Sequence, residues 1–293
     1  MPKTSYPKQW GYALAVAVLL LSPASAWALE KKGYTLPETG GYLYLGYFFR
    51  NPTFAARPDN SGLVLLRYGL HVDLQPTPWV TFSYDANLFS DRQAGNEVRP
   101  SEWDNHVALA AQWKALELSV HYERDSPADR GGLTQAYGEV QTRLLWDLKA
   151  LTPALAERFP QQGLSGFLAV GKLFAREHYF ARPDNTGSVF LRYIGHVDLT
   201  LYKRDDWTVS IGTDANFFTD RQGTNRFRPS ELDLLTSLAI RWRDWEVSLI
   251  RESDESMDRS GLVQSYYALM LRWYFDLKKF KPLSTQTAPG APE

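Results

Sequence analysis

The 293-residue sequence contains no cysteine, and beyond residue 28 it contains no long apolar run. Without cysteine the chain cannot carry a disulfide framework, a thiolate zinc site, an iron–sulfur cluster or a cysteine nucleophile. A transmembrane helix needs about 20 consecutive apolar residues, and the mean hydropathy of the chain is only −0.35. The chain is therefore not a helical membrane protein.

A charge excess of either sign is also missing. The sequence has 32 Lys+Arg against 33 Asp+Glu, a formal net charge of −1. Nucleic-acid binding needs a basic excess that neutralises phosphates, so we expect no nucleic-acid partner. There is also no glycine-rich phosphate loop and no haem attachment motif, so we expect no cofactor. The content of 44% hydrophobic and 14% aromatic residues argues against disorder.

The first 28 residues have the features of a secretory signal peptide. Lys3 and Lys8 precede an apolar stretch over residues 11–21, and Ala26 and Ala28 fit the small-x-small cleavage rule. We predict cleavage after residue 28. Residues 29–40 would then form a periplasmic N-terminal segment.

The rest of the chain contains an internal repeat. The block DANLFSDRQAGNEVRPSE at 85–102 recurs at 214–231 as DANFFTDRQGTNRFRPSE, with 12 of 18 positions identical, and HVDL at 71–74 recurs at 196–199. The repeat divides the chain into halves at about 41–149 and 166–278. This period is too long for a solenoid and indicates the duplication of a half-domain.

Within each half the hydrophobic period is two, which is typical of β-strands. In residues 63–74 the even positions are all apolar, whereas the odd ones include Arg67, His71 and Asp73. Similar segments give six strands per half, each of about 9–11 residues. We predict an all-β fold: a transmembrane antiparallel up-and-down β-barrel of about 12 strands over 41–280, followed by a polar tail over 281–293.

The connections between the predicted strands alternate in length. Long connections are expected at 51–62, 89–101 and 124–132, and short ones at 75–78 and 114–115. Between the halves, Thr152-Pro153 favours one or two helical turns. This alternation is typical of outer-membrane barrels, which have short periplasmic turns and longer extracellular loops.

Tryptophan placement favours an apolar face that points to lipid. Of the eight tryptophans after residue 28, all but Trp103 lie at strand ends on the short-turn side, as expected for an interfacial girdle: Trp79, Trp113, Trp146, Trp207, Trp242, Trp245 and Trp273. Trp79 breaks the alternation by one residue, which predicts a bulge or a late strand start. The polar face is too charged for a dry core, although a soluble sandwich or secreted barrel is the alternative.

In these features the chain resembles bacterial outer-membrane β-barrels of the porin-like class. The resemblance implies localisation in the bacterial outer membrane, with lipid and lipopolysaccharide as neighbours. The class usually closes with an aromatic final residue, whereas here Phe280 is followed by KPLSTQTAPGAPE.

The polar face supplies the candidate site residues. We predict that they line the pore or its mouth: Arg67, His71, Asp73, Asp85, Asn87, Glu102, Asp104, Glu123, Arg143, Arg192, His196, Asp198, Asp214, Asn216, Glu231, Asp233, Glu252 and Arg272. Two arcs of carboxylates at strand ends beside the long loops are expected around one opening: Asp85, Glu102 and Asp104 with Asp214, Glu231 and Asp233. Carboxylates outnumber arginines, and carboxylate rings select cations. The expectation is a narrow, weakly cation-selective channel that is not an enzyme.

Three alternatives stay open. The charged face could form an ion-pair network that fills the lumen, giving a non-conducting barrel that anchors or sheathes a periplasmic partner. The long loops could pair with one another through residues such as Asp91, Arg92 and Arg99, or bind calcium through acids such as Asp125. A hydrolase at the mouth would use Asp85, Glu102 and Asp104 with His106, but no serine or threonine nucleophile of suitable spacing stands out.

Overall fold

The computed structural model consists almost entirely of β-strands. It describes residues 38–49, 65–92, 98–127, 135–148, 152–158, 163–177, 190–221, 227–256 and 264–276. The strands are β1 (Glu38–Phe49), β2 (Leu65–Thr77), β3 (Val80–Arg92), β4 (Val98–Trp113), β5 (Leu116–Pro127), β6 (Gln135–Asp147), β7 (Gly163–Glu177), β8 (Phe190–Arg204), β9 (Trp207–Arg221), β10 (Phe227–Trp242), β11 (Trp245–Ser256) and β12 (Gln264–Asp276). The predicted signal peptide, the polar tail and most of the expected long loops lie outside the described residues.

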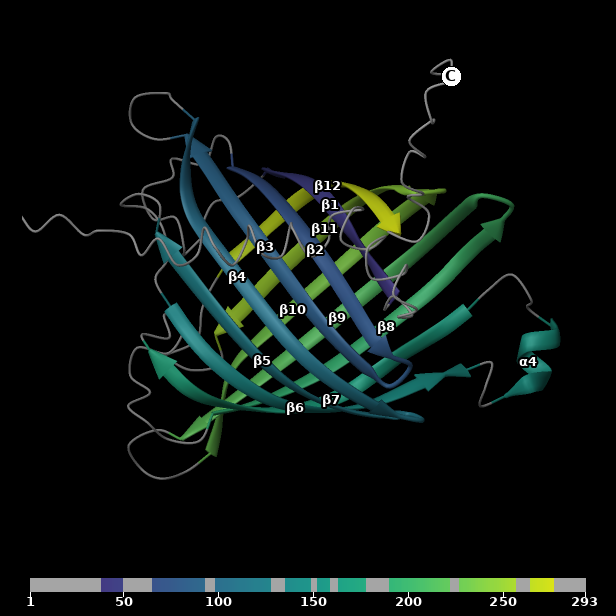
Figure 1. The fold of residues 1–293 in the computed structure, drawn as a ribbon, viewed down its shortest axis with the longest axis horizontal. Coiled ribbons are helices and arrows are strands. Elements are labelled where there is room, and N and C mark those ends of the chain that lie inside the picture. The colour runs from purple at the N-terminus through teal and green to yellow at the C-terminus, as the bar shows by residue number, and fades with distance from the viewer. Residues whose placement is uncertain are drawn as a thin grey trace, which may run out of the picture.

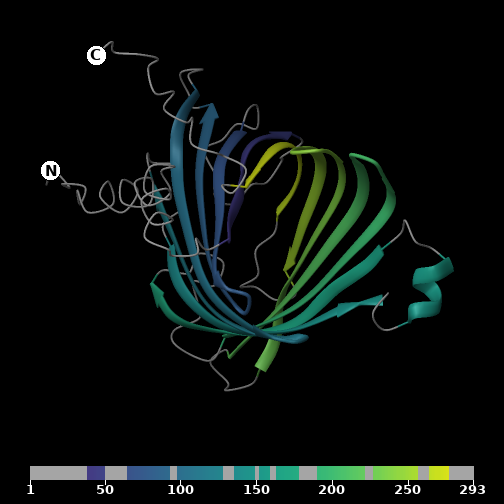
Figure 2. The same ribbon diagram turned by 45° about the vertical axis from the view of Figure 1, so that its right-hand side comes forward.

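Each strand pairs antiparallel with its neighbours in the sequence, and β12 pairs with β1. The result is a closed up-and-down barrel of twelve strands, which confirms the predicted fold. Figure 2 shows the strands as a single wall around an interior, with the helix α4 (Pro153–Arg158) outside that wall. Closure leaves no unpaired strand edge, which a lipid environment requires.

The strands contain 12 to 16 residues and are longer than the predicted 9–11. The ladder between β3 and β4 continues through Asp91 opposite Arg99 and Arg92 opposite Val98. The expectation that residues 89–101 form a long loop is therefore wrong, and Asp91, Arg92 and Arg99 belong to strands. Antiparallel pairing satisfies backbone hydrogen bonds outside the membrane as well as within it. The strands therefore extend beyond the segment in which apolar residues alternate with polar ones.

The opposite end of the barrel carries tight turns. Lys114, Asp205 and Arg243 adopt left-handed backbone conformations, with φ of 54°, 51° and 54°. The β2–β3 turn contains a register shift between Leu74 and Thr77, as the broken alternation near Trp79 predicted. In Figure 1, α4 lies at the same end of the barrel as this turn and begins at the predicted Thr152-Pro153 step.

The two faces of the wall differ as the alternation predicts. Outward-facing side chains such as Leu109 and Leu168 are 55% and 60% exposed, and form an apolar surface of the kind that faces lipid. The tryptophans Trp79, Trp113 and Trp207 are also exposed at the tight-turn end. Among the described helical residues, none forms a helix long and apolar enough to cross a membrane.

Part of the inner face is filled by apolar side chains. A buried cluster from β1, β3 and β12 consists of Tyr44, Phe48, Phe89, Tyr266, Ala268 and Met270. This cluster packs against one side of the interior, from β12 across β1 to β3. The rest of the inner wall is mainly polar, apart from a second, smaller buried cluster of Leu173 and Phe218.

Candidate functional site in the barrel interior

Each half of the chain places a histidine between two carboxylates on the inner face. In the first half, Nδ1 of His71 lies 2.7 Å from Oδ1 of Asp85, and Nε2 lies 2.9 Å from Oδ2 of Asp73. Carboxylates only accept hydrogen bonds, so His71 makes both bonds when both of its ring nitrogens carry hydrogen. The ring also stacks on Tyr42, with centroids 4.8 Å apart.

The second half repeats this arrangement. His196 bonds Asp214 at 2.7 Å and Asp198 at 2.6 Å, and it stacks on Phe167 with centroids 4.9 Å apart. Each cluster connects two neighbouring strands, because His71 is the Cα partner of Asp85 in the ladder and His196 is the Cα partner of Asp214. The shared geometry indicates a brace of the barrel wall that both halves need.

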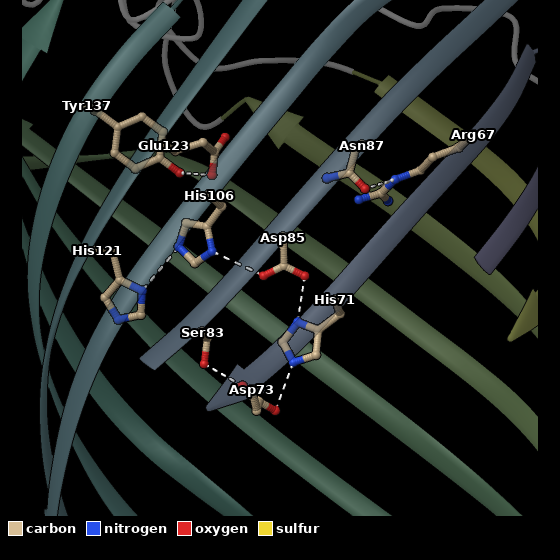
Figure 3. Close-up of polar contacts among 10 residues, drawn as sticks. All are labelled: Arg67, His71, Asp73, Ser83, Asp85, Asn87, His106, His121, Glu123 and Tyr137. Atoms are coloured by element: carbon tan, nitrogen blue, oxygen red, sulfur yellow. Dashed lines mark hydrogen bonds and ion pairs between the residues drawn. The ribbon is translucent and has the colours of Figure 1, made fainter. Parts of the chain in front are cut away.

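Only the first half continues the network beyond this brace. Oδ2 of Asp85 lies 3.3 Å from Nδ1 of His106, and Nε2 of His106 lies 3.2 Å from Nδ1 of His121. Nε2 of His121 in turn lies 2.7 Å from Oγ of Ser119. Figure 3 shows His71, Asp85, His106 and His121 pointing into the barrel from β2, β3, β4 and β5, respectively. We call the group His106, His121 and Ser119 the histidine extension.

The second half replaces the two histidines of the extension by aliphatic residues. Leu235 is the ladder partner of Asp214, as His106 is of Asp85. Ile250 occupies the place on β11 that His121 has on β5, by the repeat offset of 129 that the sequence blocks share. Ser248 instead receives a hydrogen bond of 3.0 Å from Nη1 of Arg272. The two halves therefore share a wall brace but differ in the chemistry beside it.

Arginines on the inner face bond mainly to side chains of neighbouring strands. Arg67 donates to Asn87 at 3.0 Å, and Arg192 repeats the bond to Asn216 at 3.0 Å. Arg192 also lies 3.5 Å from Glu139, whose side chain is nearly inaccessible. Further pairs join Arg143 to Glu117 at 3.3 Å and Arg272 to Glu246.

The polar part of the interior encloses a cavity of about 480 Å³. Its lining comes from β4 to β11 and combines acids, arginines, histidines and amides: His106, His121, Glu123, Tyr137, Glu139, Gln141, Arg143, Phe167, Arg192, Ile194, Asp214, Asn216, Asp233, Leu235 and Glu252. The charged side chains are not sealed from solvent. The exposed fraction is 28% for Arg143, 32% for Asp214 and 51% for Asp198.

No family model matches the chain, and no curated protein matches it in sequence. Solved structures do match. LpxR from Salmonella typhimurium aligns with a TM-score of 0.50 at 8% identity, over 80% of this chain and 100% of LpxR. An outer-membrane channel from Pseudomonas putida F1 gives 0.47 at 10% identity, over 83% and 96% of the two chains. The KdgM porin gives 0.42 at 10% identity, over 80% and 99%.

The chain is an outer-membrane β-barrel in its fold. The closed ladder, the outward apolar surface and the exposed tryptophans agree with this class and with a bacterial outer-membrane location. The chemistry of this barrel has to be judged from its own inner residues, because a fold does not fix a function.

The predicted site residues occupy different depths in this barrel. Asp85 and Asp214 lie near the middle of β3 and β9, bonded to the wall histidines. The expectation that they sit at strand ends around the mouth is wrong, because both strands run further than the apolar pattern. Asp104 and Asp233 lie on the inner face. Glu123 accepts a hydrogen bond of 2.7 Å from Tyr137, and Glu252 accepts one from Tyr266. The side chains of Glu102 and Glu231 lie outside the described residues.

Sequence reasoning missed three interior residues: Ser119, Glu139 and Gln141 are each at most 2% exposed. Glu139 and Gln141 lie four and two residues before Arg143, so the strand period already placed them on the inner face. Their importance comes from contacts across strands, which a period does not reveal. Gly171 makes room for Glu139, because a Cβ there would lie 1.6 Å from Oε1 of Glu139.

The Ser119–His121 contact has the distance of a nucleophile and its base. However, the Ser119 side chain is 1% exposed and does not line the cavity. An ester or amide carbon has no route to a hydroxyl in that position. Among the described residues, no group of three or more side chains is placed to hold a metal ion.

Proposed function

We propose that this protein is a narrow outer-membrane channel that passes ions or small solutes and favours cations. The supporting observation is that charged side chains on the inner face keep substantial exposure: 46% for Asp73 and 51% for Asp198. These residues face away from lipid, and Asp198 shares a pocket with Lys114 and Asp147 at the tight-turn end, so their exposure is to water at that opening of the barrel. A dry lumen would have to bury such charges at high cost, whereas a water-filled lumen solvates them.

The charge balance of the lumen favours cations over anions. Described carboxylates on the inner face include Asp73, Asp85, Asp104, Glu117, Glu123, Asp125, Glu139, Asp198, Asp214, Asp233, Glu246 and Glu252. The arginines there are Arg67, Arg143, Arg192, Arg241 and Arg272. A lumen with excess negative charge concentrates cations and repels anions.

The apolar cluster makes the channel narrow. The rings of Tyr44, Phe48 and Phe89 occupy the lumen beside β1 and β3, so the polar cavity lies on the side from β4 to β11. Twelve strands lie between the eight-stranded barrels whose interiors are filled and the sixteen-stranded porins with wide channels. A small conductance is the expected consequence.

Single-channel recording in planar bilayers tests the proposal. In a potassium chloride gradient the reversal potential should report a preference for potassium. The double variant Asp73→Asn, Asp198→Asn removes two of the most exposed lumen carboxylates and keeps oxygen acceptors for His71 and His196. The potassium-to-chloride permeability ratio should fall about two- to threefold, as expected for loss of unit charges several ångströms from the ion path in water.

Asp205→Asn is the matched control. Asp205 lies on a turn outside the lumen, is 83% exposed and has a positive φ that asparagine tolerates. This variant makes the same chemical change and should leave the permeability ratio unaltered. A folded barrel that shows no conductance would instead support the non-conducting anchor.

A further inference from the structure

We propose that the pair His106–His121 is a proton-operated switch that lowers the cation preference of the channel as the pH falls. The proposal rests on the proposed channel function and adds a regulation to it. Its basis is the only histidine–histidine hydrogen bond among the described residues, between Nε2 of His106 and Nδ1 of His121 at 3.2 Å. Both rings line the polar cavity, so their charge lies beside the ion path.

The number of hydrogens on the ring nitrogens of His106 and His121 determines how the pair responds to a proton. Nδ1 of His106 faces the Asp85 carboxylate and therefore carries a hydrogen. The contact between the two rings holds a single hydrogen, on either His106 or His121. In one arrangement His106 is a cation and donates to neutral His121. In the other His106 is neutral and His121 donates to it.

A second proton removes the acceptor from this contact. With both rings charged, two N–H groups face each other across 3.2 Å, and the nearly parallel rings, with centroids 5.3 Å apart, repel as like charges. The hydrogen bond then breaks and one ring turns toward the cavity. The lumen gains a positive charge, which opposes cation entry.

The two histidines of the wall brace, His71 and His196, do not act in this way. His71 and His196 each have a carboxylate at both ring nitrogens, so both are charged from the outset and a falling pH brings no new proton to them. The second half also offers no equivalent pair, since Leu235 and Ile250 stand in its place. Within the described lumen the response belongs to the histidine extension.

Charged and titratable groups from several strands surround the pair and influence whether it holds one or two protons. They are Asp85 on β3, Asp104 on β4, Glu117 and Glu123 on β5, Tyr137, Glu139 and Arg143 on β6, Arg192 on β8, Asp214 on β9, Asp233 on β10 and Glu252 on β11. Carboxylates favour uptake of a second proton, whereas burial of the His121 ring, the charge of His106 and the two arginines oppose it. Carboxylates ordinarily titrate near pH 4 and histidine near 6.5. A window from pH 8 to 5.5 therefore isolates the histidines.

The chain itself supplies the design of the test variant. His106→Leu with His121→Ile copies the residues that the second half already places beside an identical wall brace. Ser119 keeps its hydroxyl, as Ser248 does. Wild-type channels should lose about threefold in potassium-to-chloride permeability ratio between pH 8 and 5.5, the combined effect on the two oppositely charged ions of one unit charge about 12 Å away in water. The double variant should keep a constant ratio over this range.

Two further measurements distinguish failure of the switch from failure of the channel. His196→Gln removes a histidine outside the switch, and its channels should retain the pH response. Imidazole ¹⁵N NMR of the wild-type barrel in detergent micelles follows proton uptake without requiring conductance, and His121→Gln, which keeps a polar side chain, identifies the signal if the double variant does not fold. Absence of any current refutes the channel proposal. Conductance with an unchanged ratio, or no proton uptake by the pair above pH 5.5, overturns the switch.

Discussion

At the scale of single residues, the two halves solve the same packing problem with different side chains. Tyr44 covers its ladder partner Gly69, and a Cβ at Gly69 would lie 2.0 Å from Cζ of Tyr44. In the second half the corresponding partners are Ala169 and Ile194, both buried. The first half thus has the large residue on β1 and the small one on β2, whereas the second half has the small residue on β7 and the large one on β8.

This exchange gives a double-variant prediction. Gly69→Ile alone forces its side chain into the Tyr44 ring and should reduce the free energy of unfolding by about 1–3 kcal/mol. Adding Tyr44→Ala reproduces the second-half pair and should recover most of that loss, less the stacking of Arg67 on the Tyr44 ring at 5.2 Å. Urea unfolding in lipid vesicles measures both effects. A double variant no more stable than Gly69→Ile would disprove the complementarity.

At the scale of the strand, the period of two determines which side chains meet lipid. Leu109 lies four residues from the turn-side Trp113 and is 55% exposed. Leu109→Arg should reduce barrel stability by roughly 2–4 kcal/mol, because a charge near the bilayer midplane loses its hydration. Leu109→Met keeps an apolar side chain of similar volume and should change little. Equal stability of the two variants in folding assays with lipid vesicles would contradict the assigned lipid face.

The same period explains what the sequence could and could not predict. Alternation and turn chemistry were sufficient for twelve strands, their order, the irregularity near Trp79 and the helical turn at Pro153. They could not give the depth of a residue, since an apolar pattern ends at the membrane but a hydrogen-bonded ladder does not. The prediction that Asp85 lies at the mouth is wrong for this reason. The contact of His106 with His121 needed the register of β4 against β5, which no local pattern encodes.

The whole barrel combines a repeated wall with an unequal interior. His71 and His196 brace both halves alike, but the first half places histidines where the second has Leu235 and Ile250. Glu139 and Gln141 on β6 likewise correspond to the buried Ala268 and Met270 on β12. One side of the lumen is therefore packed and the other is polar. In the channel that we propose, this division confines the ion path to the polar side of the lumen.

Closure of the wall sets the stability of the whole molecule and gives the last prediction. The β1–β12 ladder runs from Gly40 opposite Asp276 to Phe49 opposite Tyr267. Deleting residues 281–293 removes nothing from this ladder, so the truncated barrel should still resist SDS until it is heated. Deleting 264–293 removes β12 and leaves β1 and β11 with open edges in lipid, where each lost backbone hydrogen bond is costly. That chain should migrate as unfolded on unheated gels. Heat-dependent migration of the longer deletion would show that the barrel closes without β12, whereas its loss in the shorter one would assign the tail a part in assembly.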